Sequence, residues 1–401
     1  MRQSKRLTRL TLACCTAVVV GISVALADEP PPLHTLPRPP STSTSQQQAP
    51  AARLPSGRPP SNPKTLRRFE STEVHMGMPF KLVLYALDEA SANKAAQAAY
   101  LRIAQLDATL SDYKAESELS RLSGTAGQGC DVPMSADLGR VLSAAQMVSE
   151  KSGGAFDVTV GPYVRLWRRA RREHELPSHE RMAEARAAVG YKHLMLGKTV
   201  DHAKVADATP AAQTARLTVP GMRLDLGGIA AGYAIDEALA VLRKHGVNRA
   251  MIDASGDIVV GDPPPDTRGW KIGIAPLSTE GPPSRFAILA NASVTTSGDA
   301  FQNVEIAGKR YSHIVDPHTG LGLTDRSSVT VIARDGLTAD SFATAVSVLG
   351  PKRGLELIES EPGAAALIVR AVVGKANGDV ETHESRRLGE YVEPVASKGD
   401  R

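Results

Sequence analysis

The sequence predicts an α+β fold with mixed, largely antiparallel sheets and flanking helices. Runs rich in β-branched and apolar residues follow one another through the C-terminal half, several with only short loops between them. Helical patterns gather between blocks of these runs, whereas a doubly wound sheet would alternate strand and helix regularly. The predicted strands there are residues 249–261, 270–275, 285–290, 293–297, 310–316, 327–334 and 365–371.

A strand followed by a helix opens the folded part. The run FKLVLYAL is typical of a strand, and the helix formers after it keep helical spacing behind Asp88, a residue type that caps helices. A second helix is predicted to begin at Ser135 and to end at the glycine pair GG, as helix stops commonly do. These elements are residues 80–87, 88–111 and 135–154, and the C-terminal half adds helices at 338–350 and 352–360.

Composition indicates one or two globular domains with tails and gives no support for nucleic-acid binding. Of the 401 residues 42% are apolar, and the formal net charge is only +4. Four basic residues within the first nine positions account for much of that surplus. We therefore expect a small-molecule or protein partner and no nucleic acid.

The N-terminus has the pattern of a secretory signal. Residues 1–27 contain a basic start, an apolar run and the cleavage pattern Ala-Leu-Ala, although the run approaches the length of a membrane anchor. Residues 28–65, rich in Pro, Ser and Gln, are predicted to be a disordered linker. The folded domain is expected at 66–392, with a polar tail at 393–401. We expect export to the periplasm or cell envelope, close to a membrane that the mature chain does not span.

The stretch DLGGIAAGYAIDEAL is the first candidate for a binding site. Gly227 and Gly228 remove two Cβ atoms at the start of a helix, which lets an anionic ligand approach the backbone. The alternative is structural: the glycines allow a tight turn, and Asp225 caps the helix. Neither of the standard glycine-rich nucleotide-binding patterns is present.

Two further motifs carry candidate chemistry. In TADSFATAV, Asp340 and Thr344 are four residues apart, so their oxygens share one helix face and can ligate a hard cation such as magnesium; a plain helical Asp and Thr is the alternative. In RYSHIVDPHTG, His313 falls within the strand pattern, either as a base or as a partly buried structural residue. The run HELPSH has the wrong spacing for a zinc site and, with RRARREHE, is expected to be a solvated basic segment.

Six blocks in order resemble one family. The blocks LSDYKAESELSRL, GGAFDVTVGPYVRLW, RLDLGGIAAGYAIDEAL, DASGDIVVG, RYSHIVDPHTG and TADSFATAV are similar to those of the ApbE family of flavin transferases, over about residues 70–372. The resemblance implies an enzyme that binds FAD and Mg²⁺, splits the pyrophosphate and transfers FMN to a Thr or Ser hydroxyl of a partner protein, releasing AMP. Acceptor flavoproteins of membrane redox complexes are the implied partners.

The resemblance also implies metal ligands and FAD contacts, and it suggests candidates for the general base. The metal ligands would be Asp340, Thr344 and the backbone carbonyl of Gly228. The FAD contacts would be Met76, Tyr113, Ala155, Phe156, Asp225 and Ile314. His313 is the first candidate for the general base. Asp340, also counted as catalytic, and Asp316 are further candidates for that role.

Three positions depart from the family pattern. Ala231 stands where a lysine is usual, Ser255 where a second glycine is usual, and His318 where an arginine is frequent. None of them belongs to the implied metal site. Two other functions remain open at this point: an FAD pyrophosphatase that transfers to water, and a non-catalytic exported flavin-binding module.

Overall fold

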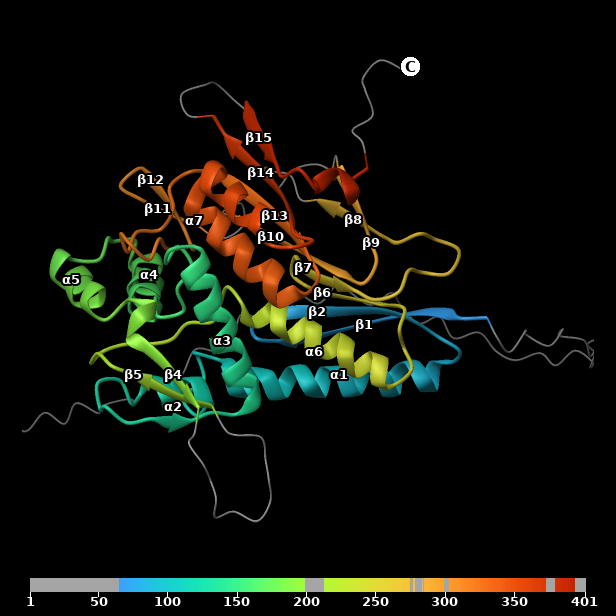
Figure 1. Ribbon diagram of the computed structural model, residues 1–401, viewed down its shortest axis with the longest axis horizontal. Coiled ribbons are helices and arrows are strands. Elements are labelled where there is room, and N and C mark those ends of the chain that lie inside the picture. Colours follow the sequence, from blue (N-terminus) through green and yellow to red (C-terminus); the bar gives the residue numbers. More distant parts are fainter. Residues whose placement is uncertain are drawn as a thin grey trace, which may run out of the picture. The chain divides into compact units, whose positions relative to one another are not determined.

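The computed structural model describes residues 65–198, 213–274, 277, 283, 285–298, 303–372 and 379–393 (Figure 1). The chain divides into two units, Met1–Pro59 and Pro60–Arg401, and every described residue belongs to the second. The predicted signal peptide, almost all of the predicted linker and most of the predicted tail lie outside the described residues. Those boundaries stay predictions.

An eight-stranded sheet organises this unit. Its strands, in sheet order, are β1 (Arg67–His75), β2 (Met78–Ala86), β6 (Ala250–Ala254), β7 (Asp257–Val260), β10 (Ala292–Gly298), β13 (Ser327–Ala333), β14 (Ala365–Ala371) and β15 (Val380–Glu384). Each strand runs antiparallel to its described neighbours. The predicted α+β class with largely antiparallel sheets is confirmed.

Three helices cover one face of this sheet (Figure 1): α1 (Glu89–Leu110), α6 (Ala230–Lys244) and α7 (Gly336–Ser360). The strands alternate as burial on two faces requires: Leu82 and Leu84 pack under the helices, while Val83 points to the other face. That other face is covered by the hairpin β8 (Trp270–Ile274) and β9 (Arg285–Leu289), whose Trp270 joins Val83 in the second core cluster.

Helix ends follow the signals in the sequence. Asp88 caps α1 by accepting a hydrogen bond from the Ser91 N–H, 2.8 Å away. Ser135 caps α3 (Ala136–Lys151), and both glycines after that helix have positive φ. Within α7 the helix breaks at Gly350, whose φ is +72°, directly before Pro351. The two helices predicted at 338–350 and 352–360 therefore meet at this kink.

The remaining elements were largely not predicted. A three-stranded sheet consists of β3 (Val132–Pro133), β5 (Gln213–Leu217) and β4 (Leu194–Lys198). The short helices are α2 (Glu118–Ser123), α5 (His179–Ala187) and the 3₁₀ turns η1 (Tyr191–His193) and η2 (Leu388–Glu390). No helix in the described part of the chain is both long and apolar enough to cross a bilayer.

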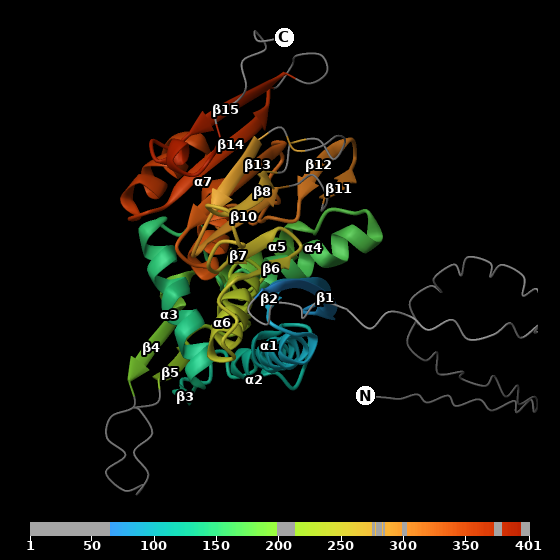
Figure 2. The ribbon, with the colours of Figure 1, turned by 90° about the vertical axis from the view of Figure 1, so that its right-hand side faces the viewer.

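A third core cluster joins α4 (Gly161–Glu173) to the hairpin β11 (Asn303–Ile306) and β12 (Lys309–Ser312). Figures 1 and 2 both show this hairpin beside α4. Trp167 lies at the centre of the cluster: its ring contacts Tyr311, and its Nε1 donates to the carbonyl of Gly320 at 2.8 Å. The strand predicted at 310–316 ends at Ser312, so the expectation of a strand histidine at His313 is wrong.

Candidate active site

One cavity of about 890 Å³ brings together all the predicted site residues except Asp316, the further candidate for the base. The residues come from separate parts of the chain: the β1–β2 turn, the loops after α1 and α3, the turn before α6, the segment after β12, and α7. They are Met76, Tyr113, Ala155, Phe156, Asp225, Gly228, His313, Ile314, Asp340 and Thr344. Their common location agrees with a shared site, while their individual roles stay predictions.

One of the two structural explanations for the turn before α6 is confirmed: Gly227 and Gly228 lie in a tight turn, in which the Ile229 N–H donates to the Leu226 carbonyl at 3.1 Å. The other explanation, a helix cap at Asp225, is wrong. The helix begins at Ala230 and its cap residue makes no side-chain hydrogen bond, so Asp225 is not the helix cap. Instead, the Asp225 carboxylate accepts a hydrogen bond from the Gly227 N–H at 2.9 Å. Neither Gly227 nor Gly228 has positive φ. A Cβ at Gly228 would lie 2.8 Å from Oγ1 of Thr344, so this glycine is required for close approach of the turn to α7.

Helix α7 carries the two polar residues that face this turn. Asp335 caps the helix by accepting from the Thr338 N–H at 2.8 Å, and the first turns then place Asp340 and Thr344 on one face. Asp340 is only 4% exposed. Burial raises the pKa of its carboxyl, and the nearby carboxylate of Asp257 raises that pKa further.

The oxygen atoms at this point suit a hard cation. The carboxylates of buried Asp340 and half-buried Asp257 repel each other, and the Gly228 backbone lies against the Thr344 side chain in the same cavity. No three His, Cys, Asp or Glu side chains of the described residues form a metal-binding group, so a metal here depends on hydroxyl and carbonyl donors as well. Carboxylate, hydroxyl and carbonyl oxygens are the donors that Mg²⁺ prefers, and the residues present fit this ion.

An arginine that the sequence analysis left among solvated residues organises another wall of the cavity. Arg168 pairs with Asp112, and its other nitrogen lies 3.1 Å from the Asp225 carboxylate. Its guanidinium also stacks over the Tyr113 ring, 4.0 Å from the ring centre. Burial and Asp112 raise the pKa of Asp225. Arg168 therefore positions both Tyr113, whose ring is 77% exposed, and Asp225.

The segment after β12 contributes His313 and Ile314 to the cavity. The Ile314 N–H donates to the Ser312 hydroxyl at 3.1 Å, which shapes the bend that carries His313. Asp316 does not line the cavity. Its carboxylate accepts from the His318 N–H at 2.9 Å and from the Thr319 hydroxyl at 3.0 Å, so it is used in the following turn.

The other predicted contacts lie in turns around the cavity. Met76 occupies the two-residue turn between β1 and β2 and has a positive φ of 51°. Ala155 and Phe156 follow the glycine stop of α3 and are buried. Ala231 and Ser255 also line the cavity, and Ser255 adopts φ +57° in the turn between β6 and β7. The usual glycine at this position would adopt that φ without strain.

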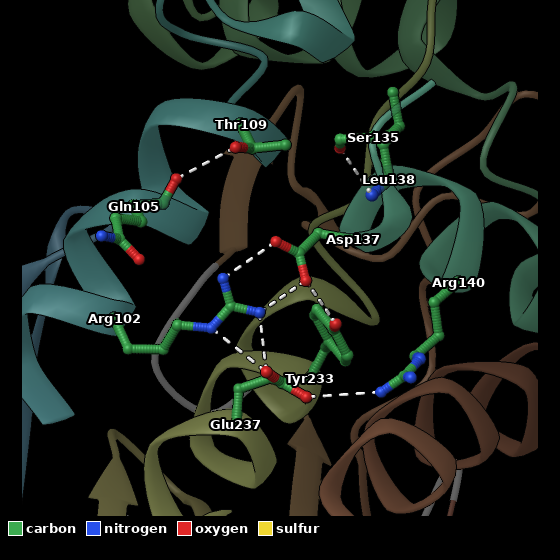
Figure 3. Close-up of polar contacts among 9 residues, drawn as sticks. All are labelled: Arg102, Gln105, Thr109, Ser135, Asp137, Leu138, Arg140, Tyr233 and Glu237. Carbon is green, nitrogen blue, oxygen red and sulfur yellow. Dashed lines mark hydrogen bonds and ion pairs between the residues drawn. The ribbon is translucent and has the colours of Figure 1, made fainter. Parts of the chain in front are cut away.

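Behind the site, α6 is fixed to α1 and α3 by an ionic network (Figure 3). Arg102 on α1 binds Asp137 on α3 at 2.5 Å and Glu237 on α6 at 2.6 Å. Tyr233 on α6 donates to Asp137 at 2.7 Å, and burial together with that bond raises the pKa of Tyr233. The neighbouring Gly232 N–H in turn donates to Asp340 at 3.1 Å, which links the network to the site.

Three cavity residues were missed in the sequence. Asp257 was quoted inside DASGDIVVG without a role; its strand position, beside an apolar Ile258 on the opposite face, could have indicated that it points toward the helices. Arg168 and Arg171 were expected to be solvated, which is wrong because both line the cavity. Their spacing from Val164 is four and seven residues, a helical stripe that could have been detected.

Comparison with known proteins identifies the family of this chain. The model of the ApbE family matches residues 76–368. The chain is 32% identical to the FAD:protein FMN transferase of Haemophilus influenzae over 270 residues, covering 66% of this chain and 75% of that one. It is 30% identical to the FAD:protein FMN transferase of Treponema pallidum over 315 residues, covering 76% and 85%.

Solved structures show the same architecture. The flavin transferase ApbE from Vibrio cholerae superposes with a TM-score of 0.69 at 24% identity, covering 81% of this chain and 99% of that chain. The apo flavinyl transferase ApbE of Pseudomonas stutzeri gives 0.67 at 28% identity, covering 81% and 97%. The fold is thus that of the flavin transferases. The chain belongs to the ApbE family, which confirms the family predicted from the six sequence blocks.

Proposed function

We propose that this chain is an FAD:protein FMN transferase. A Thr or Ser hydroxyl of an acceptor protein attacks the phosphorus of the FMN half of FAD, the bond to the AMP oxygen breaks, and AMP leaves with the bonding electron pair. The names of the related proteins support this activity. The observation that carries it is the single cavity in which buried Asp340, Thr344 and the Gly228 backbone meet a histidine and an exposed tyrosine ring.

Phosphoryl transfer depends on positioning and on neutralising the charge that develops on oxygen. Asp340, Thr344 and the Gly228 carbonyl would hold Mg²⁺, which supplies that neutralisation when bound. Met76, Tyr113, Ala155, Phe156, Asp225 and Ile314 would contact FAD. Tyr113 offers an exposed ring face for stacking, and the ion pair with Arg168 keeps Asp225 in place.

His313 is proposed as the base that accepts the proton of the attacking hydroxyl. It lines the cavity, whereas the carboxylate of Asp316 is used in its own turn. Asp340 is assigned to the metal, which leaves His313 as the better placed candidate. Full transfer activity in His313→Ala would remove this assignment.

The test is a transfer assay with the purified chain, FAD, Mg²⁺ and an acceptor domain, followed by mass spectrometry of the acceptor. The expected result is an added FMN mass and released AMP, both lost with chelator and in Asp340→Asn. Asp335→Asn, which changes an acidic helix cap on the same helix outside the cavity, is the control and should keep transfer. AMP and free FMN with an unmodified acceptor would favour a pyrophosphatase, and bound but intact FAD would favour a flavin-binding module.

We also propose that the chain acts in the periplasm or cell envelope on flavoproteins of membrane redox complexes. The signal-like residues 1–27 support this location, and the Pro-rich segment after them would separate the domain from the membrane surface. Expression of the full chain with fractionation and N-terminal sequencing tests it. A chain that keeps Met1 and stays in the cytoplasm would contradict the proposal.

A further inference from the structure

Helix α4 presents three stripes of side chains to three different surroundings. One stripe packs in the third core cluster, one lines the cavity, and one is exposed to solvent. The spacing within each stripe is three or four residues, as one helix face requires. The core stripe is Tyr163, Trp167 and Ala170; the cavity stripe is Val164, Arg168 and Arg171; the exposed stripe is Arg165, Arg169 and Arg172.

Arg171 differs from the other lysine and arginine side chains of the cavity. Lys114 is paired with Asp107 at 2.6 Å, and Arg168 is paired with Asp112 and Asp225. Arg171 makes no hydrogen bond or ion pair with any residue that the structure describes, although it is partly buried. Burial lowers its pKa; Tyr113 opposes this shift and the positive charge of Arg168 adds to it. A guanidinium withdrawn from water without a partner costs free energy that a bound anion would offset.

The part of the cavity formed by α6 contributes no positively charged side chain. Ala231, on α6, lines the cavity with an apolar side chain and is buried. The ionisable groups near that helix are the carboxyls of Asp257 and Asp340, which bring no positive charge. An anionic ligand in this cavity therefore finds its free cationic side chain on α4, on the side where Tyr113 and Arg168 also lie.

We propose that Arg171 binds a phosphate group of the dinucleotide substrate and is a substrate-positioning residue. The inference rests on the proposed function, since FAD supplies the phosphates. A planar guanidinium with several N–H donors suits phosphate oxygens and can bind two of them at once. Arg168 stays paired with its carboxylate partners and positions Tyr113 and Asp225, whereas Arg171 is available for the phosphate.

The test compares dissociation constants of FAD and riboflavin, measured by flavin fluorescence on the full chain in chelator, so that no metal contributes. Riboflavin has the flavin ring without phosphate. Arg171→Ala should weaken FAD binding about 10- to 100-fold, the range expected when one charged hydrogen-bonding partner is lost. Riboflavin binding should change less than about twofold. Arg172→Ala, on the exposed stripe of the same helix, is the matched control and should bind both ligands like the wild type.

Each result decides a separate point. Arg171→Ala that binds FAD as tightly as wild type would overturn the inference alone, and so would an equal loss for FAD and riboflavin, which would indicate a structural role. Arg171→Lys keeps the charge and should recover part of the FAD affinity; it also serves if the alanine variant does not fold, which thermal unfolding reports. A wild-type chain that binds no FAD either in chelator or with Mg²⁺ would overturn the proposed function itself.

Discussion

The Gly232 N–H of α6 donates a hydrogen bond to the buried carboxylate of Asp340 on α7, across 3.1 Å. The two helices approach so closely at this point that a Cβ at Gly232 would lie 2.2 Å from the Gly336 carbonyl oxygen and 2.8 Å from the Asp340 Cβ. The backbone contact between α6 and α7 thus sets the place of the carboxylate that the site uses.

Gly232→Ala should therefore separate the two helices. Backbone atoms surround the added methyl group, so we expect a loss of about 1–3 kcal/mol in the free energy of unfolding, measured with urea, together with loss of transfer activity. Gly389→Ala is the control, because a Cβ there meets no atom within 4 Å. Equal stability of the two variants would contradict this account of the helix contact.

Metal binding should be detectable from thermal stability, without an activity assay. If Asp340, Thr344 and the Gly228 carbonyl hold Mg²⁺, the ion binds only the folded chain, and a 100-fold excess over its dissociation constant adds about 2.7 kcal/mol of stability. Calorimetry should then show a higher Tm with Mg²⁺ for the wild type and for Thr344→Ser, which keeps the hydroxyl. Asp340→Asn should show no such rise; the same increase in that variant would place the metal elsewhere.

The two arginines of the ionic network in Figure 3, Arg102 and Arg140, should contribute unequally to the free energy of unfolding. Arg102→Ala leaves Asp137 and Glu237 without their main partner in a half-buried position, so we expect a loss of about 1–3 kcal/mol in unfolding free energy. Arg140 is 67% exposed at its side chain and lies 3.4 Å from Glu237, so Arg140→Ala should cost less than about 0.5 kcal/mol. Chemical denaturation of both variants measures the difference, and similar losses would argue against a central role for Arg102.

Asp236 should make stability depend on pH. Its carboxylate accepts from the N–H groups of Gly336 and Leu337 at 2.7 and 2.9 Å, yet burial raises its pKa from 3.8 to about 7. The folded chain therefore holds this proton more tightly than the unfolded chain. The resulting stabilisation is complete below about pH 4 and is lost as the pH rises to 7.

The comparison with Asp236→Asn isolates this effect, since asparagine does not titrate. The unfolding free energy of the wild type minus that of the variant should fall between pH 4.5 and 7.5, an interval chosen to span the two pKa values. Asp88, the cap of α1, has a lowered pKa because Ser91 donates to it. The same difference for Asp88→Asn should stay flat over that interval. A flat profile for Asp236 would show that its proton is not held on folding.

The sequence predicted helix and strand boundaries best where the signals that set them lie within the segment itself. The helix after Asp88 was predicted at 88–111 and spans Glu89–Leu110, because capping and apolar spacing act within the segment itself. The strand containing His313 was predicted too long, because the bend after Ser312 depends on that residue's side chain and not on β propensity. Arg168 and Arg171 were misplaced for a similar reason: a basic helix end looks solvated until the cavity beside it is known.

Because the core stripe and the cavity stripe of α4 lie on different faces, substitutions in one affect stability and substitutions in the other affect ligand binding. Replacing Trp167 with alanine removes a buried ring and should lower the free energy of unfolding by about 3–5 kcal/mol. Substitutions in the core stripe are therefore limited by stability. Substitutions at Arg171 do not touch that core cluster and change only the charge that lines the cavity. Substitutions on the cavity stripe can therefore change what the cavity binds without opening a void in the core.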